Sequence, residues 1–212
     1  MATLLEQLST RVVVGDGDVA AYLYAKGTSM GRSFEELCLT DPDLVREAHR
    51  AYLEAGAELI ATNSFAASLP SLKKHGLEDK ANEINWKAAK LALGEAKDHS
   101  AWVAGCIGPS GWTAAERNGA GAKELEEIFR KQAGALIDGG VQAILLQSFS
   151  DPEELELAIT AVRTLHHLPA IAMLASGREG TLPGGRGWEE TARRLRAAGA
   201  EDRKSTRLNS SH

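Results

Sequence analysis

The two cysteines of this 212-residue sequence have the widest chemistry of its side chains, because a thiolate can ligate a metal, attack an electrophile or form a disulfide. Cys38 lies in EELCLT and Cys106 in GCIGP. Two cysteines cannot make a disulfide framework, and these follow different predicted elements, so nothing in the sequence brings them together. We expect each to be a small buried thiol rather than a metal ligand.

A polar-Ser-Phe sequence occurs twice, each time after a glycine and a short apolar run. Asn63-Ser64-Phe65 follows GAELIAT, and Gln147-Ser148-Phe149 follows GVQAILL. In both places the pattern predicts a glycine that ends a helix, a buried strand, and polar side chains at the carboxyl end of that strand. The likeness fits an internal repeat and equally the general similarity of any two βα units.

The strands that would position these residues are short apolar runs rich in small or branched residues, as expected for strands buried on both faces. Five such runs are present: Arg11–Gly15, Ala57–Thr62, Trp102–Ile107, Val141–Gln147 and Pro169–Leu174.

Amphipathic segments alternate with these runs and predict helices. They cover Asp41–Ala55, Glu124–Asp138, a segment that opens at Asp151-Pro152, and Trp188–Ala198. Asp41 and Asp151 are predicted N-caps because a proline follows each, and glycines at 56 and 139–140 are predicted helix ends.

Repeated β-then-α units predict a parallel sheet wrapped by helices. An eight-stranded βα barrel takes about 250 residues, so five strands and a last helix would make roughly five-eighths of one. A flavodoxin-like open sheet also has five strands and is a rival by counting alone. The first turn weighs against that rival, because GDGDVAAY lacks the glycine spacing of a phosphate-binding loop.

Composition limits the class of protein. The sequence is 43% hydrophobic and 25% charged, with a net charge of −5, which gives no general attraction to nucleic acid or anionic membranes. The N-terminus lacks a signal-peptide pattern, and no apolar run approaches the roughly 20 residues that span a bilayer. We expect a cytoplasmic protein without nucleic-acid or membrane partners, whose oligomeric state stays open.

The end of the chain breaks the βα pattern. After AAGAE the sequence reads DRKSTRLNSSH, which is polar and basic where a buried strand is due. We expect residues 1–200 to form the domain and residues 201–212 to be a foreign segment, similar to translated sequencing-adapter tails. A native disordered tail is the alternative.

Five motifs in order resemble the homocysteine S-methyltransferase family, which includes the homocysteine-binding module of cobalamin-dependent methionine synthase and betaine–homocysteine methyltransferase. They are GDGDVAAYLYAKG at 15–27, FEELCLTDPDLVREAHRAYLEAGAELIATNSFAAS at 34–68, LKKHGLEDKANEIN at 72–85, GCIGPSG at 105–111 and LLQSFSDPEELELAI at 145–159. The likeness covers residues 11–200. It implies an α/β fold, an incomplete TIM (βα)8 barrel with about five to six units present and the C-terminal units missing.

The resemblance also implies a chemistry. Members of the family bind homocysteine at the carboxyl ends of the strands, and its thiol must become a thiolate to attack a methyl group. In the family, a zinc ion held by three cysteines, with its fourth position open, binds that sulfur. Those cysteines lie in a Gly-x-Asn-Cys motif after strand 6 and a Gly-Gly-Cys-Cys motif near strand 8, and this sequence has neither motif.

The residues carried over by the resemblance are those that would bind the amino acid. Asp16 and Gly17 match the family's Asp-Gly after strand 1, and Asn63 and Ser64 match its polar pair after strand 2. The alternatives are a turn glycine at the first pair and a helix cap or turn at the second. Gln147 replaces a glutamate that receives the substrate's ammonium, so an acceptor oxygen is kept and a charge is lost. Other donors could compensate, or the substrate could differ.

These implications predict a zinc-dependent, full-length parent that moves a methyl group onto homocysteine to give methionine, from a donor that the sequence does not identify. The present chain is expected to be inactive because it lacks the zinc ligands. A non-catalytic or degenerate barrel fragment that binds an amino acid is the alternative. The native continuation after Glu201 would separate the two readings.

We predict that this chain does not retain zinc. Metal analysis after purification should find far less than one zinc per chain, because neither Cys38 nor Cys106 has predicted partner ligands. One zinc per chain that survives dialysis against a weak chelator would contradict the assignment of both cysteines as buried thiols.

Overall fold

A parallel sheet organises the molecule. The computed structural model describes residues 3–165, 168–176, 182 and 187–201. In these ranges the strands β1 (Leu59–Ala61), β2 (Trp102–Ile107), β3 (Ala143–Phe149) and β4 (Ala170–Leu174) form one sheet in the order β1-β2-β3-β4, and each neighbouring pair is parallel. This sequential order excludes the flavodoxin-like alternative, in which the strand order reverses at a switch point.

The prediction of a strand at Arg11–Gly15 is wrong. The last residue of this run forms only an isolated parallel bridge with Leu59. Two backbone hydrogen bonds support the bridge, from Leu59 N to Val14 O at 3.1 Å and from Asp16 N to Leu59 O at 2.9 Å. Val12 and Val14 are 78% and 52% exposed, so the run lacks the burial that holds the interior strands. It is an extended segment at the edge of β1.

The strand β3 also departs from its predicted bounds, because it runs from Ala143 to Phe149 rather than from Val141 to Gln147. Ser148 has a φ of 60°, and the register with β4 shifts between Leu146 and Phe149. Gln147 therefore lies inside the strand and within this irregularity, directly before Ser148.

Two predicted helices begin at the expected caps. The side chain of Asp41 accepts a hydrogen bond from Leu44 N at the start of α4 (Pro42–Glu54), and Asp151 accepts one from Glu153 N at the start of α9 (Pro152–Arg163). Gly56 follows α4 with a φ of +99°, a left-handed conformation that favours glycine at a helix end.

The remaining elements complete the βα alternation. The helix α8 (Ala120–Gly139) begins four residues before its predicted start and has Gly140 as its C-cap, and α10 (Trp188–Ala197) ends one residue early. The others are α1 (Leu4–Thr10), α2 (Val19–Ala25), α3 (Leu37–Thr40), α5 (Leu69–Lys73), α6 (Ala81–Ala96) and α7 (Ala114–Arg117), with 3-10 turns at Glu78–Lys80 and Lys97–His99.

Of the predicted tail, residues 201–212, all but Glu201 lies outside the described residues. Among the described residues, none of the helices combines the length and apolar character that crossing a bilayer requires.

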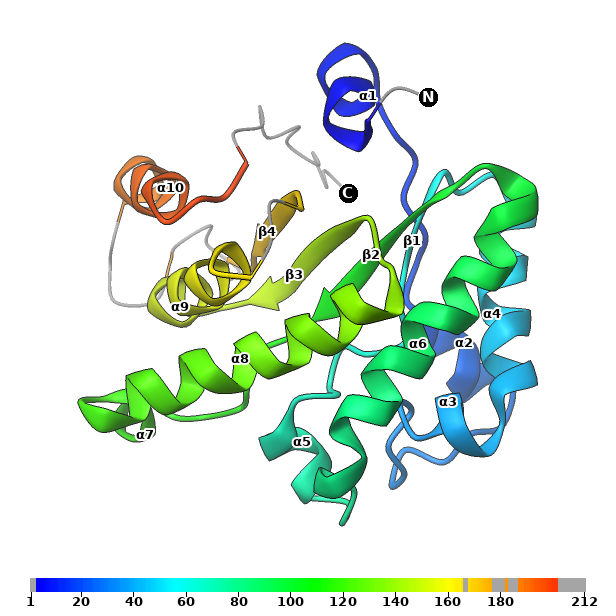
Figure 1. Ribbon diagram of the computed structural model, residues 1–212, viewed down its shortest axis with the longest axis horizontal. Coiled ribbons are helices and arrows are strands. Elements are labelled where there is room, and N and C mark those ends of the chain that lie inside the picture. Colours follow the sequence, from blue (N-terminus) through cyan, green and yellow to red (C-terminus); the bar gives the residue numbers. More distant parts are fainter. Residues whose placement is uncertain (1–2, 166–167, 177–181, 183–186, 202–212) are drawn as a thin grey trace.

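The main core lies between the sheet and the helices α4, α6, α8 and α9, which all cover the same face (Figure 1). Alternate strand residues point into it, as the two-residue period of a strand requires. The strands contribute Ile60, Val103, Ile107, Ile144 and Leu146, and the helices α8 and α9 contribute Leu125, Phe129, Leu136, Leu155 and Ile159.

The opposite face of the sheet, here called the inner face, carries the other alternate residues: Leu59, Trp102, Ala104, Ala143, Leu145 and Ile171. Leu4 and Leu8 of α1 pack against it, and α1 lies on the side away from the other helices (Figure 1). The two faces are therefore covered very differently within the described residues.

A buried histidine on α4 makes part of the free energy of unfolding depend on pH. His49 is fully buried, and neither ring nitrogen has a hydrogen-bond partner among the described residues. Burial lowers its pKa from 6.5 to about 4. The unfolded chain therefore binds more protons than the folded chain between these values, so this stability is present above pH 6.5 and is lost as the pH falls towards 4.

We predict that His49→Leu removes this pH dependence. Between pH 7 and pH 5 the free energy of unfolding of the unsubstituted chain should fall by about 2 kcal/mol through this residue, and the variant should lose that much less. Urea unfolding at both pH values measures the difference, with His75→Gln as a control at an exposed histidine. Equal pH dependence in all three proteins would contradict the burial argument.

Candidate functional site

Buried side-chain hydrogen bonds join the carboxyl ends of β1 and β2 after β1 stops at Ala61. Thr62 Oγ1 accepts from Cys106 N at 2.9 Å, and Ser64 Oγ donates to Cys106 O at 2.7 Å. The two hydroxyl oxygens lie 2.6 Å apart. All three residues are buried, so side chains continue the pairing between strands where the strand β1 has ended.

Asn63 and Ser64, predicted to bind substrate, both direct their polar groups at the protein. Asn63 Nδ2 donates to Phe34 O at 2.8 Å and lies 3.6 Å from Cys38 Sγ, which itself donates to Asn63 O at 3.5 Å. Gln132 on α8 donates from Nε2 to Ser64 O at 2.9 Å. These contacts fasten the loop after β1 to its surroundings.

Asp16 is fixed at the carboxyl end of β1. Its Oδ2 accepts a hydrogen bond from Ala61 N at 2.7 Å. Burial raises the pKa of this carboxyl group from 3.8 to about 6, and the hydrogen bond from Ala61 only partly opposes the effect. In such an environment the ionised form of the carboxyl group destabilises the folded chain. Carboxyl groups with a raised pKa are typical of functional sites.

Glycine is needed at position 17 because the backbone there lies close to the side chain of Tyr52, and not because the chain turns. A Cβ atom at this position would lie 2.8 Å from Cε1 of Tyr52. The tyrosine is held there because its hydroxyl donates to Asp18 O at 3.0 Å. Glycine thus lets the segment after Asp16 lie directly on α4.

Gln147 reaches the same region from β3. Cys106 Sγ donates to Gln147 Oε1 at 3.1 Å. Burial raises the pKa of the Cys106 thiol, and the negative charges of Asp16 and Glu35 raise it further. The thiol is therefore a neutral hydrogen-bond donor, not a nucleophile. Of the five predicted residues, Ser64 and Gln147 contact Cys106, and the charge of Asp16 acts on its thiol, whereas Gly17 and Asn63 contact α3, α4 and nearby loops.

Two buried carboxylates near the strand ends were not predicted as site residues. Glu35 accepts from Ala66 N and from Ser33 Oγ, each at 2.9 Å. Glu154 accepts from Ser110 N at 2.7 Å and from Ser110 Oγ at 2.6 Å. The sequence could have indicated that Glu154 is buried, because it lies four residues before Ala158 and therefore on the apolar stripe of α9.

Arg117 completes the second of these networks. It forms ion pairs with Asp151 and, at 3.5 Å, with Glu154 Oε2. Both glutamate and arginine are shielded from water, and a buried charge requires such a partner. The network attaches the loop between β2 and α8 to the start of α9, next to the strand end that carries Gln147.

The described residues do not fit a zinc site. Within the described ranges no group of three or more His, Cys, Asp or Glu residues could hold a metal ion. Both cysteines are buried, as expected, and neither forms a disulfide. Burial raises the pKa of Cys38 to about 12, whereas a zinc ligand must be a thiolate.

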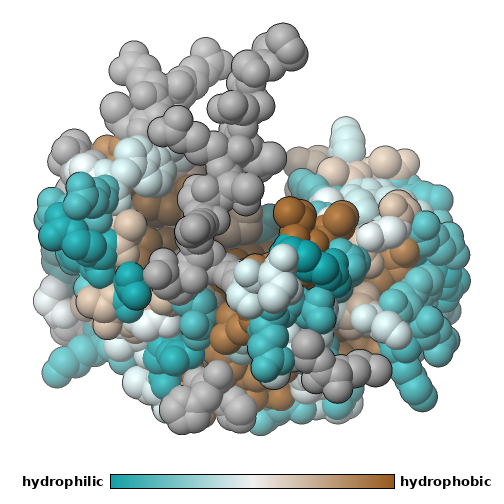
Figure 2. Space-filling view, turned by 90° about the horizontal axis from the view of Figure 1, so that it is seen from above, coloured by the Kyte–Doolittle hydropathy of each residue, from teal (hydrophilic) through white to brown (hydrophobic). Residues whose placement is uncertain are grey.

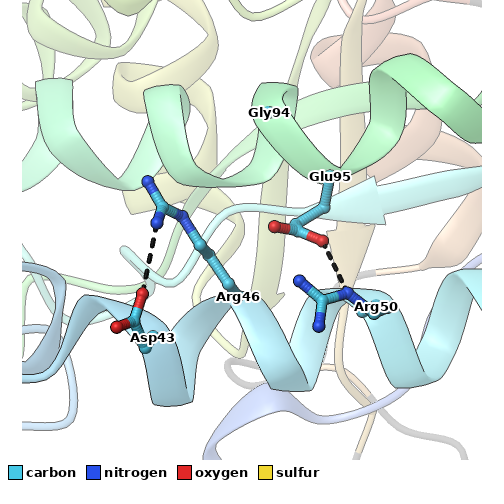
Figure 3. A pocket seen from close by; sticks show the side chains of 5 residues that line it. All are labelled: Asp43, Arg46, Arg50, Gly94 and Glu95. Carbon is cyan, nitrogen blue, oxygen red and sulfur yellow. Dashed lines mark hydrogen bonds and ion pairs between the residues drawn. The ribbon is translucent and has the colours of Figure 1, made fainter.

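A surface hollow of about 450 Å³ lies between α4 and α6, away from the strand ends (Figure 3). Its two arginines already have acidic partners: Arg46 Nη1 lies 3.2 Å from Asp43 Oδ1, and Arg50 Nε lies 3.0 Å from Glu95 Oε2. Because these charges are paired, and all but Glu95 are exposed, the hollow offers no chemistry comparable with the contacts around Cys106.

Comparison with known sequences gives a consistent result. The family model described as "Homocysteine S-methyltransferase" matches residues 13–209. Over 195 residues the chain is 28% identical to methionine synthase of Mycobacterium leprae (strain TN) and 29% identical to that of Mycobacterium tuberculosis (strain ATCC 25618 / H37Rv). Each match covers 84% of this chain but only 16% of the relative, so the chain spans a small part of these proteins.

Solved structures agree on the fold. The oxidised form of the homocysteine methyltransferase MmuM from Escherichia coli superposes with a TM-score of 0.77 and 22% identity, covering 92% of this chain and 72% of that one. Its metallated form gives a TM-score of 0.76 and 21% identity, covering 91% and 73%. The parallel α/β arrangement is therefore shared with these proteins.

We predict that Asp16→Asn stabilises the chain at neutral pH. The pKa of Asp16 is raised on folding, so its stabilising effect is present below pH 3.8 and is lost as the pH rises through about 6. An amide cannot ionise and still accepts from Ala61 N, so the free energy of unfolding at pH 7.5 should rise by about 1–2 kcal/mol, with a smaller gain at pH 4.

Urea unfolding at the two pH values measures this effect. Asp18→Asn is the matched control, because it removes one charge from the same segment and keeps an oxygen to cap α2. A loss of stability in Asp16→Asn at pH 7.5 would show that the ionised carboxylate supports the fold.

Proposed function

The chain belongs to the homocysteine S-methyltransferase family, and we propose that it forms the amino-acid-binding part of an enzyme that transfers a methyl group to homocysteine. The observation that carries the proposal is that Ser64 and Gln147 both contact Cys106 at the carboxyl ends of the strands, where the negative charge of Asp16 also raises the pKa of the Cys106 thiol. Parallel α/β enzymes bind their substrates at these ends.

In this proposal Asp16 supplies the negative charge for the ammonium group of homocysteine. Gln147 adds a neutral acceptor oxygen where the family has a carboxylate. A bound ammonium would favour ionised Asp16 and so lower its raised pKa, which would couple substrate binding to loss of a proton near pH 6. Asn63 and Ser64 act indirectly, through the shape of the loop that they fasten.

The reaction itself is a transfer of a methyl group between two atoms. Homocysteine loses its thiol proton, its sulfur lone pair forms a bond to the methyl carbon, and the bond between that carbon and the donor breaks with its electrons left on the donor. The product is methionine. The described residues fit recognition of the amino acid but not activation of the sulfur, because both of their thiols are buried and protonated. We therefore place the zinc ligands in other βα units and leave the methyl donor open.

The proposal includes an incomplete (βα)8 barrel. It is supported by the sequential parallel strand order, by helices that cover one face of the sheet, and by the fold shared with MmuM. In a closed barrel the inner face would be filled by side chains from all strands. The domain boundary at residue 200 stays a prediction.

The function is tested with a barrel completed by the native or a related C-terminal part. This protein is incubated with homocysteine and, separately, with methylcobalamin, betaine or S-methylmethionine as donor, and methionine is measured by mass spectrometry. Methionine from at least one donor supports the proposal. Homocysteine binding without methionine from any donor would instead support a non-catalytic amino-acid-binding barrel.

We predict that Gln147→Glu in the same completed protein tightens homocysteine binding roughly 5- to 30-fold. A hydrogen bond to a charged partner exceeds a neutral one by about 1–2 kcal/mol, and about 1.4 kcal/mol corresponds to tenfold in affinity. The KM for homocysteine should fall, with less effect on kcat.

Gln142→Glu is the matched control, since this exposed glutamine lies directly before β3, at the amino end of the strand that carries Gln147, where its Oε1 accepts from Val103 N. Unchanged or weaker affinity in Gln147→Glu would place the ammonium elsewhere and weaken the case for homocysteine as substrate.

A further inference from the structure

The side chains of Cys106 and Gln147 meet on the inner face of the sheet. Cys106 pairs in register with Leu145, and Gln147 follows Leu145 by two residues, so strand alternation directs both side chains to this face. The face is otherwise apolar, and Figure 2, which looks onto the side of the molecule where α1 lies, shows hydrophobic residues near its middle. On an apolar surface a donor without an acceptor is costly.

The thiol of Cys106 is a donor that is held in one place. Thr62 Oγ1 accepts from the N–H of Cys106 at 2.9 Å, and Ser64 Oγ donates to its carbonyl at 2.7 Å, so its backbone is held on both sides. Cys106 is 2% exposed, and burial keeps the thiol protonated. A protonated thiol has one hydrogen to donate, and its sulfur is only a weak acceptor. Among the described residues that hydrogen has one acceptor, Gln147 Oε1 at 3.1 Å.

The amide of Gln147 needs such a contact to have a defined orientation. Its oxygen accepts hydrogen bonds and its nitrogen only donates them, so the two ends of the group are not equivalent. Gln147 is partly exposed and lies in the irregular part of β3, and the thiol is its one side-chain hydrogen-bond partner among the described residues. The reverse orientation would turn an N–H group towards the S–H group. The thiol therefore determines where the oxygen lies.

One acceptor position on that oxygen stays available. An amide oxygen has two lone pairs, so Oε1 of Gln147 can accept from the thiol and from one further donor. A carboxylate in the same place would need no orienting donor, because both of its oxygens accept. An amide that takes over the role of a carboxylate does need one.

We propose that Cys106 is a positioning residue, whose thiol selects the amide orientation of Gln147 and so holds the second lone pair of Oε1 ready for the ammonium group of the amino acid. The inference rests on the proposed function. Cys106 acts on the ligand only through Gln147, and its hydrogen, rather than its size, is the property that matters.

Three variants of the chain separate the donor from the space that it fills. Cys106→Ala and Cys106→Ser both remove the sulfur, but only serine keeps a donor. Cys106→Val fills the space and cannot donate. If the hydrogen bond decides, the serine variant should resemble the unsubstituted chain, and the alanine and valine variants should resemble each other.

The first measurement needs no ligand. NMR relaxation of the ¹⁵N-labelled side-chain amides reports their motion on the picosecond to nanosecond timescale. The Gln147 signal is identified by its loss in Gln147→Glu. We expect this amide to be ordered in the unsubstituted chain and in Cys106→Ser, and mobile in the other two variants. The side-chain amide of Gln142, whose Oε1 accepts from Val103 N, is the internal control and should be equally ordered in all four proteins.

The second measurement is the affinity for L-homocysteine, from titration of the same four proteins. Cys106→Ala and Cys106→Val should bind roughly 3- to 10-fold more weakly than the unsubstituted chain, because binding must then immobilise a free side chain. Cys106→Ser should bind within about twofold of it, since its hydroxyl donates to the same oxygen.

Equal order of the Gln147 amide in all four proteins would overturn the inference, and so would equal affinity for homocysteine. Equal weakening in all three variants would assign Cys106 a packing role and would overturn it as well. These results leave the proposed function standing as long as the unsubstituted chain binds homocysteine. Failure of the unsubstituted chain to bind would contradict the proposed function, and the order of the amide in the free proteins would still show whether the thiol selects its orientation.

Discussion

The arrangement of the strand ends depends on hydrogen bonds to the backbone of Cys106. Thr62 binds its N–H and Ser64 binds its carbonyl, so the loop after β1 is fixed to β2 by side chains rather than by strand pairing. The Cys106 thiol then reaches Gln147 on β3. Because Thr62, Ser64 and Cys106 are buried, each hydrogen bond left unmade among them would cost roughly 1–3 kcal/mol, so the three chain segments keep one mutual arrangement. The candidate site exists only in that arrangement.

The need to fix the strand ends explains why the buried carboxyl groups have different hydrogen-bond partners. Glu35 and Glu154 have several donors each and hold loops in place, so their burial is compensated. Asp16 has one strong donor, from Ala61 N, and is held where its ionised form is unfavourable. An arrangement that costs stability in the free protein but would favour a bound cation is what a recognition site for an ammonium group requires.

Sequence patterns predicted the helices best where local chemistry decides the structure. Asp41 with Pro42 and Gly56 fixed the ends of α4, because caps act within a few residues. The run at Arg11–Gly15 has the residues of a strand but lies at an edge, and edge position is a property of the whole sheet. The partners of Asn63 and the contacts around Cys106 join residues 25 to 44 positions apart, and no local pattern encodes them. Resemblance to a family found Asp16 and Gln147, but only the structure shows their partners, the Ala61 amide and the Cys106 thiol.

The central claim is that the strand ends around Cys106 bind the amino-acid part of homocysteine. A titration of the ¹⁵N-labelled chain with L-homocysteine, followed by NMR, tests it most directly because weak binding is still visible. The account predicts that the amide signals of Gly17, Ser64 and Gln147 shift together along one saturation curve, while those of Arg50 and Glu95 beside the hollow between α4 and α6 stay in place. Shifts centred on Arg50 and Glu95, or no shift at the strand ends at saturating homocysteine, would contradict it.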